Sequence, residues 1–315
     1  MRVALVTPGG QARSETRPFV DAMRATFDLR ELAWTEGPWP AVGDTDVAVS
    51  FVKFRHLLQS DTIDWAGFTG LKVHYDWDAL QDAHWTDSPY AGTWAGTLRR
   101  HGFDLAITTG VRARDGLRAQ GIDAEAIHKA AAGAIRDLGL SRDSVYGTFG
   151  YDYPSRVLMK AELRRAGIPL EAFEVPFADL SPALNRFLAV ISCTLDARLR
   201  APALGRRLHR AFPRTFIVAG RSPEPMGKFF EIAASGAAPF VDWTPDLDML
   251  GFVDGRNCIT YRTIPELAER ARHFLDRPDE LRAVGVEAAS IARGHTWAAR
   301  AETFRAVFED RLSAG

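Results

Sequence analysis

The stretch PMGKFFEIAASG, residues 225–236, and the apolar run AAPFV at residues 237–241 decide our interpretation of the fold. Read as a helix, the stretch places Lys228, Glu231 and Ser235 on one side and apolar residues on the other. A proline near its start and a glycine at its end are typical of the two ends of a helix. The run that follows is typical of a short buried strand. Together they predict a helix packed on a sheet, with a lysine and a glutamate on one edge.

Two interpretations of this edge are open from the pattern alone. An exposed Lys–Glu pair at helical spacing stabilises a helix by roughly a few tenths of a kcal/mol and needs no further role. Alternatively, the edge is a nucleotide site. The start of the helix, with Gly227 and Lys228, would then face a diphosphate, and Glu231 would accept hydrogen bonds from ribose hydroxyls.

Composition narrows the possible classes of protein. With 315 residues, of which 46% are hydrophobic, the chain can bury a large core and favours two domains. A net charge of −1 gives no electrostatic basis for binding nucleic acid or an anionic membrane. Cys193 and Cys258 have neither metal-binding spacing nor a disulfide framework, which fits a reducing cytoplasm. The chain starts directly with a strand pattern, and its longest apolar run, near residues 187–195, is too short to span a bilayer.

The first half alternates apolar runs with amphipathic stretches, which predicts a parallel sheet covered by helices on both faces. Gly9 and Gly10 follow the first strand directly and would open a cleft at the carboxyl edge of that sheet. A tight strand-to-helix turn needs the same residues, and no complete G-x-G-x-x-G supports a nicotinamide site. The expected strands are 3–6, 27–32, 46–51, 71–75 and 103–108, and the expected helices are 17–27, 93–101 and 113–120, followed by a helical or irregular connector at 124–144.

The second half repeats this opening. A strand at 145–149 runs into a glycine-containing loop at 150–156, and a helix follows. The pattern therefore predicts two similar α/β halves with a cleft between them. The remaining expected strands are 170–175, 187–192, 237–241 and 257–261, with 215–218 ambiguous, and the remaining helices are 156–166, one around 182–185, 264–275, 278–293 and 297–312.

Four sequence motifs of the second half resemble a known family. They are Lys228-x-x-Glu231-Ile-x-Ala-x-Gly236, Asp246-Leu-x-x-Leu-Gly251-Phe-x-Asp254-Gly255-x-Asn257, Tyr261, and His295-Thr296-Trp297-x-x-Arg300. Over roughly residues 145–305 the chain is similar to the CgeB-type, or spore-maturation-like, glycosyltransferases, which have the GT-B fold of two Rossmann-like domains.

This resemblance implies a division of labour. It implies an N-terminal Rossmann-like acceptor domain at 1–140, on which a C-terminal helix at 297–315 packs, and a nucleotide-sugar donor domain at 141–296. It also implies no obligatory metal and no cofactor beyond the nucleotide-diphosphate-sugar donor. Many retaining GT-B enzymes carry two glutamates separated by seven residues, the second aligning with Glu231. Here Pro223 occupies the first position and Glu224 lies one place away, so the sugar contacts and the stereochemical class stay open.

Within the donor domain, the resemblance and the residue chemistry together suggest the binding residues. Without a metal, cationic side chains and backbone N–H groups must meet the departing phosphates. Lys228 is the first candidate for such a cation. Gly150 and Arg156 are the second candidate phosphate contact. Alternatively, they are only a turn followed by an exposed arginine. Tyr151 could stack on a base, and Tyr261 could line the site or belong to the core.

In the first half, His74 and Asp76 lie at the end of a predicted strand. Because they are two residues apart, their side chains point to the same face of the sheet. Either residue could orient or deprotonate the acceptor hydroxyl. Alternatively, Asp76 and Asp78 cap the next helix and His74 is a core residue with its hydrogen bonds satisfied. Asp76-x-Asp78 and Asp246-x-Asp248 also match the D-x-D of metal-dependent transferases, but a pattern this short often arises by chance.

We therefore expect a cytoplasmic, metal-independent, hexosyltransferase-like GT-B enzyme. It would transfer a sugar from a nucleotide-diphosphate-sugar to an unidentified hydroxyl acceptor, without nucleic acid and without a membrane span. Two alternatives stay open from the sequence: a nucleotide-sugar epimerase on the same fold, and a non-catalytic nucleotide-binding or scaffolding protein that kept the fold.

Overall fold

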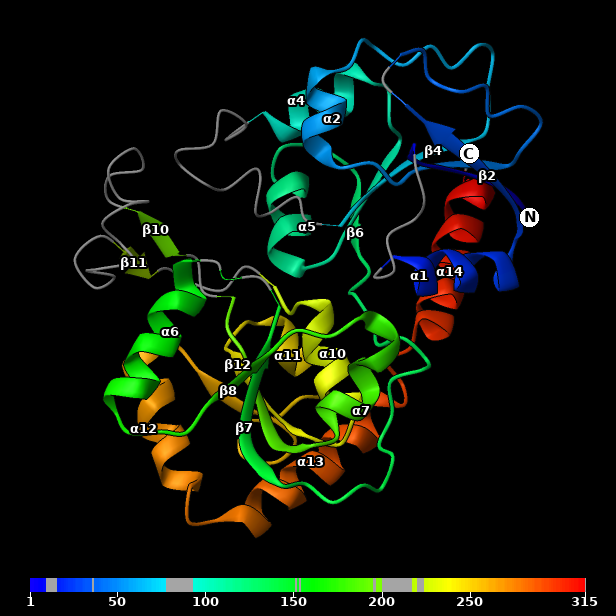
Figure 1. Ribbon diagram of the computed structural model, residues 1–315. Coiled ribbons are helices and arrows are strands. Elements are labelled where there is room, and N and C mark those ends of the chain that lie inside the picture. The colour runs from blue at the N-terminus through cyan, green and yellow to red at the C-terminus, as the bar shows by residue number, and fades with distance from the viewer. Residues whose placement is uncertain are drawn as a thin grey trace. The chain divides into compact units, whose positions relative to one another are not determined.

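A computed structural model describes residues 1–9, 16–35, 37–77, 93–150, 152, 154–194, 197–199, 217–219 and 224–314 (Figure 1). The chain divides into two compact units. The N-terminal unit is Met1–Lys129 together with Trp297–Gly315, and the C-terminal unit is Ala130–Thr296. The boundary expected near residue 140 therefore falls inside the C-terminal unit. Each unit is an α/β layer structure, which confirms the expected fold class.

A six-stranded sheet forms the centre of the N-terminal unit, in the order β2-β1-β3-β4-β5-β6, and every neighbouring pair is parallel. Its inner strands are buried on both faces, as continuous apolar runs in a parallel sheet require. The strands are β1 (Arg2–Pro8), β2 (Asp28–Trp34), β3 (Val47–Ser50), β4 (Leu71–Asp76), β5 (Leu105–Thr108) and β6 (Ala124–Ala126).

The last of these strands corrects the sequence analysis. Ala124–Ala126 is an edge strand paired with β5, although the sequence suggested a helical or irregular connector there. Three residues, one of them Glu125, are too few to show an alternating pattern. The pairing therefore depends on β5 already being in place beside it.

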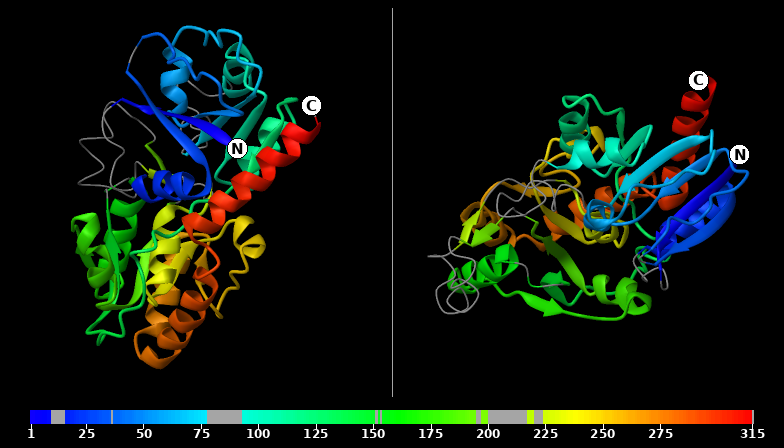
Figure 2. Two further views of the ribbon diagram at one scale, coloured as in Figure 1. Left: turned by 90° about the vertical axis from the view of Figure 1, so that its right-hand side faces the viewer. Right: turned by 90° about the horizontal axis from the view of Figure 1, so that it is seen from above.

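Helices cover both faces of this sheet. On one face lie α2 (Phe54–Gln59), α4 (Trp94–Arg100) and α5 (Val111–Arg118). On the other, α14 (Trp297–Ala314) packs along α1 (Arg17–Thr26), and these two helices are red and dark blue in Figures 1 and 2. The Phe304 ring lies 5.7 Å from Phe19 and 5.0 Å from Tyr75, between ring centroids. The C-terminal helix thus completes the core of the N-terminal unit.

The C-terminal unit has a five-stranded parallel sheet in the order β13-β12-β9-β7-β8. Helices α6 and α12 pack on one face, and α7, α10 and α13 pack mainly on the other (Figure 1). The elements are β7 (Ser144–Phe149), α6 (Pro154–Arg165), β8 (Glu171–Phe173), η1 (Phe177–Asp179), α7 (Leu180–Leu184), β9 (Phe187–Ser192), α10 (Gly227–Ala234), β12 (Ala238–Asp242), α11 (Asp246–Met249), β13 (Ile259–Tyr261), α12 (Ile264–Phe274) and α13 (Pro278–Ala292), with a separate antiparallel pair β10 (Ala197–Leu199) and β11 (Ile217–Ala219).

Both sheets reverse their winding direction beside their first strand. In the N-terminal unit β1 lies between β2 and β3, and in the C-terminal unit β7 lies between β8 and β9. A glycine follows each of these strands, Gly9 after β1 and Gly150 after β7. In open parallel sheets, ligands bind outside the carboxyl ends of the strands at such a reversal. The topology therefore directs attention to Gly9 and Gly150.

The stability of the N-terminal unit should depend on the protonation of His101, which follows α4. Its buried ring lies 2.7 Å from the Leu57 carbonyl through Nε2 and accepts the Ile63 N–H through Nδ1 at 3.3 Å. Burial lowers the pKa of His101. Because the unfolded chain takes up this proton near pH 6.5 and the folded chain only at lower pH, stability should fall as the pH drops below about 6.5.

Chemical unfolding at neutral and at mildly acidic pH measures this dependence, and His101→Gln should reduce the loss on acidification. An equal loss in wild type and variant would show that His101 does not contribute.

Candidate functional site

Lys228 and Gly150 meet at the carboxyl edge of the C-terminal sheet. Lys228 Nζ donates to the Phe149 carbonyl at 2.9 Å and lies 4.7 Å from the centroid of the Phe149 ring. Gly150 has a φ of +83°, in the left-handed region that favours glycine. A Cβ atom at this position would lie only 1.8 Å from Lys228 Nζ. The lysine can occupy its place only because residue 150 has no side chain.

Arg156 brings a second positive charge to the same point. It lies in the first turn of α6, and only 3% of its surface is exposed. Its Nη1 atom would lie 3.3 Å from a Cβ atom at Gly150. The ammonium and the guanidinium therefore both reach the space above this glycine. Cationic groups gathered at a glycine turn, where the backbone can be closely approached, are suited to binding phosphate oxygens. We call Gly150, Arg156 and Lys228 the Gly150 cluster.

Helix α10 supplies Lys228 to this cluster. It begins at Gly227, directly after the extended residue Met226, and its buried face packs through Phe229 and Phe230. Its first N–H groups carry the positive end of the helix dipole. Glu231 lies one turn beyond Lys228, and both side chains are partly exposed. The helix predicted from the sequence is confirmed, with the lysine in its first turn and the glutamate one turn further along.

Tyr261 does not belong with this group. Its side chain is fully buried, and its hydroxyl donates to the Ser192 carbonyl at 2.8 Å. Burial raises the pKa of Tyr261 well above its ordinary value. The expectation that Tyr261 lines a ligand site is therefore corrected, because the ring is part of the sheet's core. Tyr151 lies outside the described residues.

The structure adds a polar residue that the sequence analysis did not single out. Asp242, fully buried at the carboxyl end of β12, accepts hydrogen bonds from both the N–H and the hydroxyl of Thr194, which follows β9. These bonds tie the ends of two neighbouring strands together. The sequence did contain a sign of this residue's special role, because Asp242 is an acidic residue at the end of an otherwise apolar strand. Glu224, two residues before Met226, is also buried, with 1% of its surface exposed.

In the N-terminal unit, His74 and Asp76 lie at the carboxyl end of β4. His74 Nδ1 is 3.2 Å from the Ser50 hydroxyl of neighbouring β3, and His74 Nε2 is 3.6 Å from Asp76 Oδ2. His74 is 0% and Asp76 2% exposed. As predicted, the two side chains share one face of the sheet. They form a buried polar chain that ends at the carboxyl edge.

A cavity of about 340 Å³ lies beside Gly9, at the reversal of the N-terminal sheet. A Cβ atom on Gly9 would lie 1.9 Å from Thr35 Cγ2, so a larger residue here would displace the neighbouring strand end. The Trp34 and His56 rings form part of the wall, with centroids 6.4 Å apart. The cavity is lined by Pro8, Gly9, Trp34, Thr35, Val52 and His56.

In the Asp246-x-Asp248 pattern the two carboxylates lie in different environments. Asp246 is buried and accepts the Thr244 hydroxyl at 2.7 Å, whereas Asp248 is exposed. Asp78 lies outside the described residues. Within the described part of the chain, no three His, Cys, Asp or Glu side chains are grouped so as to hold a metal ion. No helix there is long and apolar enough to cross a membrane.

Comparison with known proteins gives a family match and several similar folds. The family model described as glycosyl transferase-like matches residues 144–306, more than half of the chain. A search of curated proteins gave no match.

Among solved structures, sucrose-phosphate synthase from Thermosynechococcus elongatus matches with a TM-score of 0.66 at 11% identity, covering 100% of both chains. HepE of Anabaena in complex with UDP matches with a TM-score of 0.65 at 12% identity, covering 98% of this chain and 100% of HepE. The apo form of the lipopolysaccharide outer core galactosyltransferase WaaB matches with a TM-score of 0.62 at 9% identity, covering 98% of this chain and 100% of WaaB.

At these identities the solved structures establish the fold, and the family model covers the sheet, the helix α10 and the Gly150 cluster. The chain belongs to the glycosyl transferase-like family and has the GT-B fold.

Proposed function

We propose that this protein transfers a sugar from a nucleotide-diphosphate-sugar, held by the C-terminal unit, to a hydroxyl acceptor held by the N-terminal unit. The observation that carries the proposal is the convergence of Lys228 and Arg156 on Gly150, at the carboxyl edge of the sheet that the family model matches. A diphosphate is the part of a sugar nucleotide that two cations at a glycine turn would bind.

In the proposed reaction, the bond between the anomeric carbon and the diphosphate oxygen breaks, and a bond from that carbon to the acceptor oxygen forms. The acceptor hydroxyl loses its proton, and the diphosphate leaves with its charge. Lys228, Arg156 and the first N–H groups of α10 would stabilise this developing charge without a metal ion. Glu231 would accept hydrogen bonds from the ribose hydroxyls, because a carboxylate accepts two of them at once.

Two finer assignments belong to the same proposal. HepE of Anabaena was solved with UDP and with UDP-glucose, which makes uracil the first base to test. The motifs around Lys228, Asp246 and His295 support CgeB-type membership within the family. Cys193 and Cys258 are buried and form no disulfide, which supports a reducing compartment such as the cytoplasm.

For the acceptor, we propose the cavity beside Gly9 as its binding site and His74 with Asp76 as the residues that orient or deprotonate its hydroxyl. The cavity lies where ligands of open parallel sheets bind, and the His74–Asp76 pair ends at the same edge. Both side chains are buried in the ligand-free chain, and catalytic groups commonly reach their working geometry only with substrate bound.

The donor site is tested by thermal unfolding with UDP, GDP, dTDP, CDP and ADP. A ligand that binds only the folded chain raises the melting temperature, so at least one nucleotide should raise it by several degrees. Lys228→Ala and Glu231→Ala should each weaken that binding by about tenfold, since each removes a charged hydrogen-bond partner, while the melting temperature without ligand stays nearly the same.

Two exposed residues of α13, Arg282 and Glu287, supply the matched controls. Arg282→Ala and Glu287→Ala should leave nucleotide binding unchanged. Unaltered affinity in both α10 variants would place the nucleotide elsewhere. Binding without release of UDP from any sugar nucleotide would favour a non-catalytic protein, and conversion of the sugar nucleotide without acceptor would favour an epimerase.

Gly150→Ala should disrupt the Gly150 cluster through backbone strain and a steric clash. The left-handed φ costs alanine about 1–2 kcal/mol, and the added methyl displaces the Lys228 ammonium. We expect both lower stability and loss of nucleotide binding. Gly167→Ala is the matched control, because Gly167 has a φ of +71° but no atom within 4 Å of its Cβ position. It should lower the stability similarly and keep nucleotide binding. Equal nucleotide affinity in the Gly150 and Gly167 variants would argue against the Gly150 cluster as the nucleotide site.

Asp76→Asn and His74→Gln test the acceptor side through the rate of UDP release from the donor. If these residues act on the attacking hydroxyl, the rate should fall by on the order of 100-fold with unchanged UDP affinity. Thr97→Val, which removes a different buried polar group of the N-terminal unit, controls for general destabilisation and should keep its rate per folded molecule. A full rate in either the Asp76 or the His74 variant would make these residues structural.

A further inference from the structure

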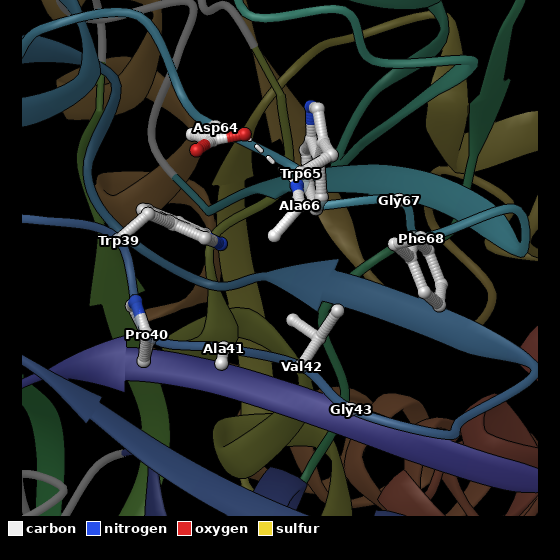
Figure 3. A pocket seen from close by; sticks show the side chains of 10 residues that line it. All are labelled: Trp39, Pro40, Ala41, Val42, Gly43, Asp64, Trp65, Ala66, Gly67 and Phe68. Carbon is white, nitrogen blue, oxygen red and sulfur yellow. Dashed lines mark hydrogen bonds between the residues drawn. The ribbon is translucent and has the colours of Figure 1, made fainter.

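A second cavity of the N-terminal unit, of about 220 Å³, shares none of its lining residues with the cavity beside Gly9. Two loops form it. One lies between β2 and β3, and the other leads into β4 (Figure 3). Its residues are Trp39, Pro40, Ala41, Val42, Gly43, Asp64, Trp65, Ala66, Gly67 and Phe68. The cavity is smaller than those that hold drug-sized ligands, so it has room for a single ring.

We propose that this cavity binds one pyranose ring of a saccharide. The proposal rests on three features of its wall: several aromatic rings, a rigid turn that holds two of them, and two polar groups, a sheltered hydrogen-bond donor and an acceptor at the rim.

Trp39, Trp65 and Phe68 supply the aromatic surface. The Trp39 and Trp65 centroids lie 6.2 Å apart, and the Trp65 and Phe68 centroids 6.0 Å apart. Figure 3 shows Val42 between them, with its side chain directed into the cavity. The C–H groups on the face of a pyranose ring carry partial positive charge, and an aromatic face carries partial negative charge. Tryptophan and phenylalanine faces therefore suit a sugar ring better than aliphatic walls would.

A strained turn holds two of these rings in place. Ala66 has a φ of +44° and Gly67 a φ of +80°, and the Phe68 N–H donates to the Trp65 carbonyl at 2.8 Å. Two successive left-handed residues make a type I′ turn, which an alanine rarely adopts. The Trp65 indole is fixed further, because its Nε1 donates to the His101 carbonyl at 2.7 Å. The rings are thus positioned before any ligand arrives, which lowers the entropic cost of binding.

Two polar groups distinguish a saccharide from an apolar ligand. The Asp64 carboxylate is exposed at the rim, and Oδ1 accepts the Ala66 N–H at 2.9 Å, which leaves Oδ2 for a ligand hydroxyl. The second group, the Trp39 indole nitrogen, is sheltered from solvent and has no acceptor among the described residues. Figure 3 shows this nitrogen on the cavity side of the ring. A small readjustment of Trp39 would let a hydroxyl oxygen satisfy it, whereas a hydrocarbon would leave both groups unused.

A sugar held here would keep the rest of its glycan close to the N-terminal unit, raising its local concentration. That consequence rests on the proposed function, but the site itself does not, since free saccharide binding requires neither donor nor transfer.

The test follows the indole N–H signal of Trp39 by two-dimensional NMR, identified through its loss in Trp39→Phe. The probes are methyl α-glucopyranoside, methyl β-glucopyranoside, methyl β-galactopyranoside and, as an apolar ring of similar size, cyclohexylmethanol. We expect at least one glycoside to shift the signal in a saturable manner at millimolar concentrations, and cyclohexylmethanol to bind more weakly.

Asp64→Asn keeps the Oδ1 atom that accepts the Ala66 N–H in the turn, but it removes the negative charge. It should weaken glycoside binding by about fivefold, which corresponds to the contribution of one hydrogen bond to the binding free energy. The exposed Asp61, three residues earlier, provides the matched control, and Asp61→Asn should bind as wild type does. Phe68→Leu keeps an apolar side chain but removes the aromatic face, and should also weaken binding.

UDP affinity should be unchanged in all these variants, which separates this site from the donor site. The proposal is overturned if no glycoside shifts the Trp39 signal, or if cyclohexylmethanol binds as tightly and the Asp64 and Phe68 variants bind the glycosides as wild type does.

Discussion

The contact between the Lys228 ammonium and the Phe149 carbonyl, above a residue without a side chain, is the constraint on which the proposed donor site depends. Lys228 reaches this carbonyl because Phe229 and Phe230 bury the opposite face of α10 against the sheet. Gly150 leaves the space that the ammonium occupies. Remove either the apolar face or the glycine, and the cation loses its place. The site is thus a product of packing as much as of charge.

The same topological device appears twice in the chain. Each sheet reverses direction beside its first strand, and each first strand is followed by a glycine whose missing Cβ is needed for close packing, against Thr35 in one unit and Lys228 in the other. The chemistry differs between the two positions. Gly150 is met by cations, whereas Gly9 borders a cavity walled by an indole and an imidazole. This difference is the basis for proposing a charged donor on the C-terminal unit and an acceptor on the N-terminal unit.

Long apolar patterns were reliable guides to the fold, because burial on both faces of a parallel sheet demands them. The strand Phe187–Ser192 was predicted with its exact bounds for this reason. Short elements were not predictable in the same way. Ala124–Ala126 is a strand only because β5 offers it a partner, and Tyr261, which could have faced a ligand, is turned into the core by the packing of β13.

The amino-acid sequence by itself determined the two-sheet α/β architecture, the helix that carries Lys228 and Glu231, and the glycine loops after the first strand of each half. These follow from local periodicity and from the conformations open to glycine. Only the tertiary structure decided that Arg156 and Lys228, more than seventy residues apart in the chain, reach the same glycine, that Asp242 binds Thr194, and that Trp39 and Trp65 wall one cavity. Such distances depend on how whole elements pack, and no local pattern of residues encodes them.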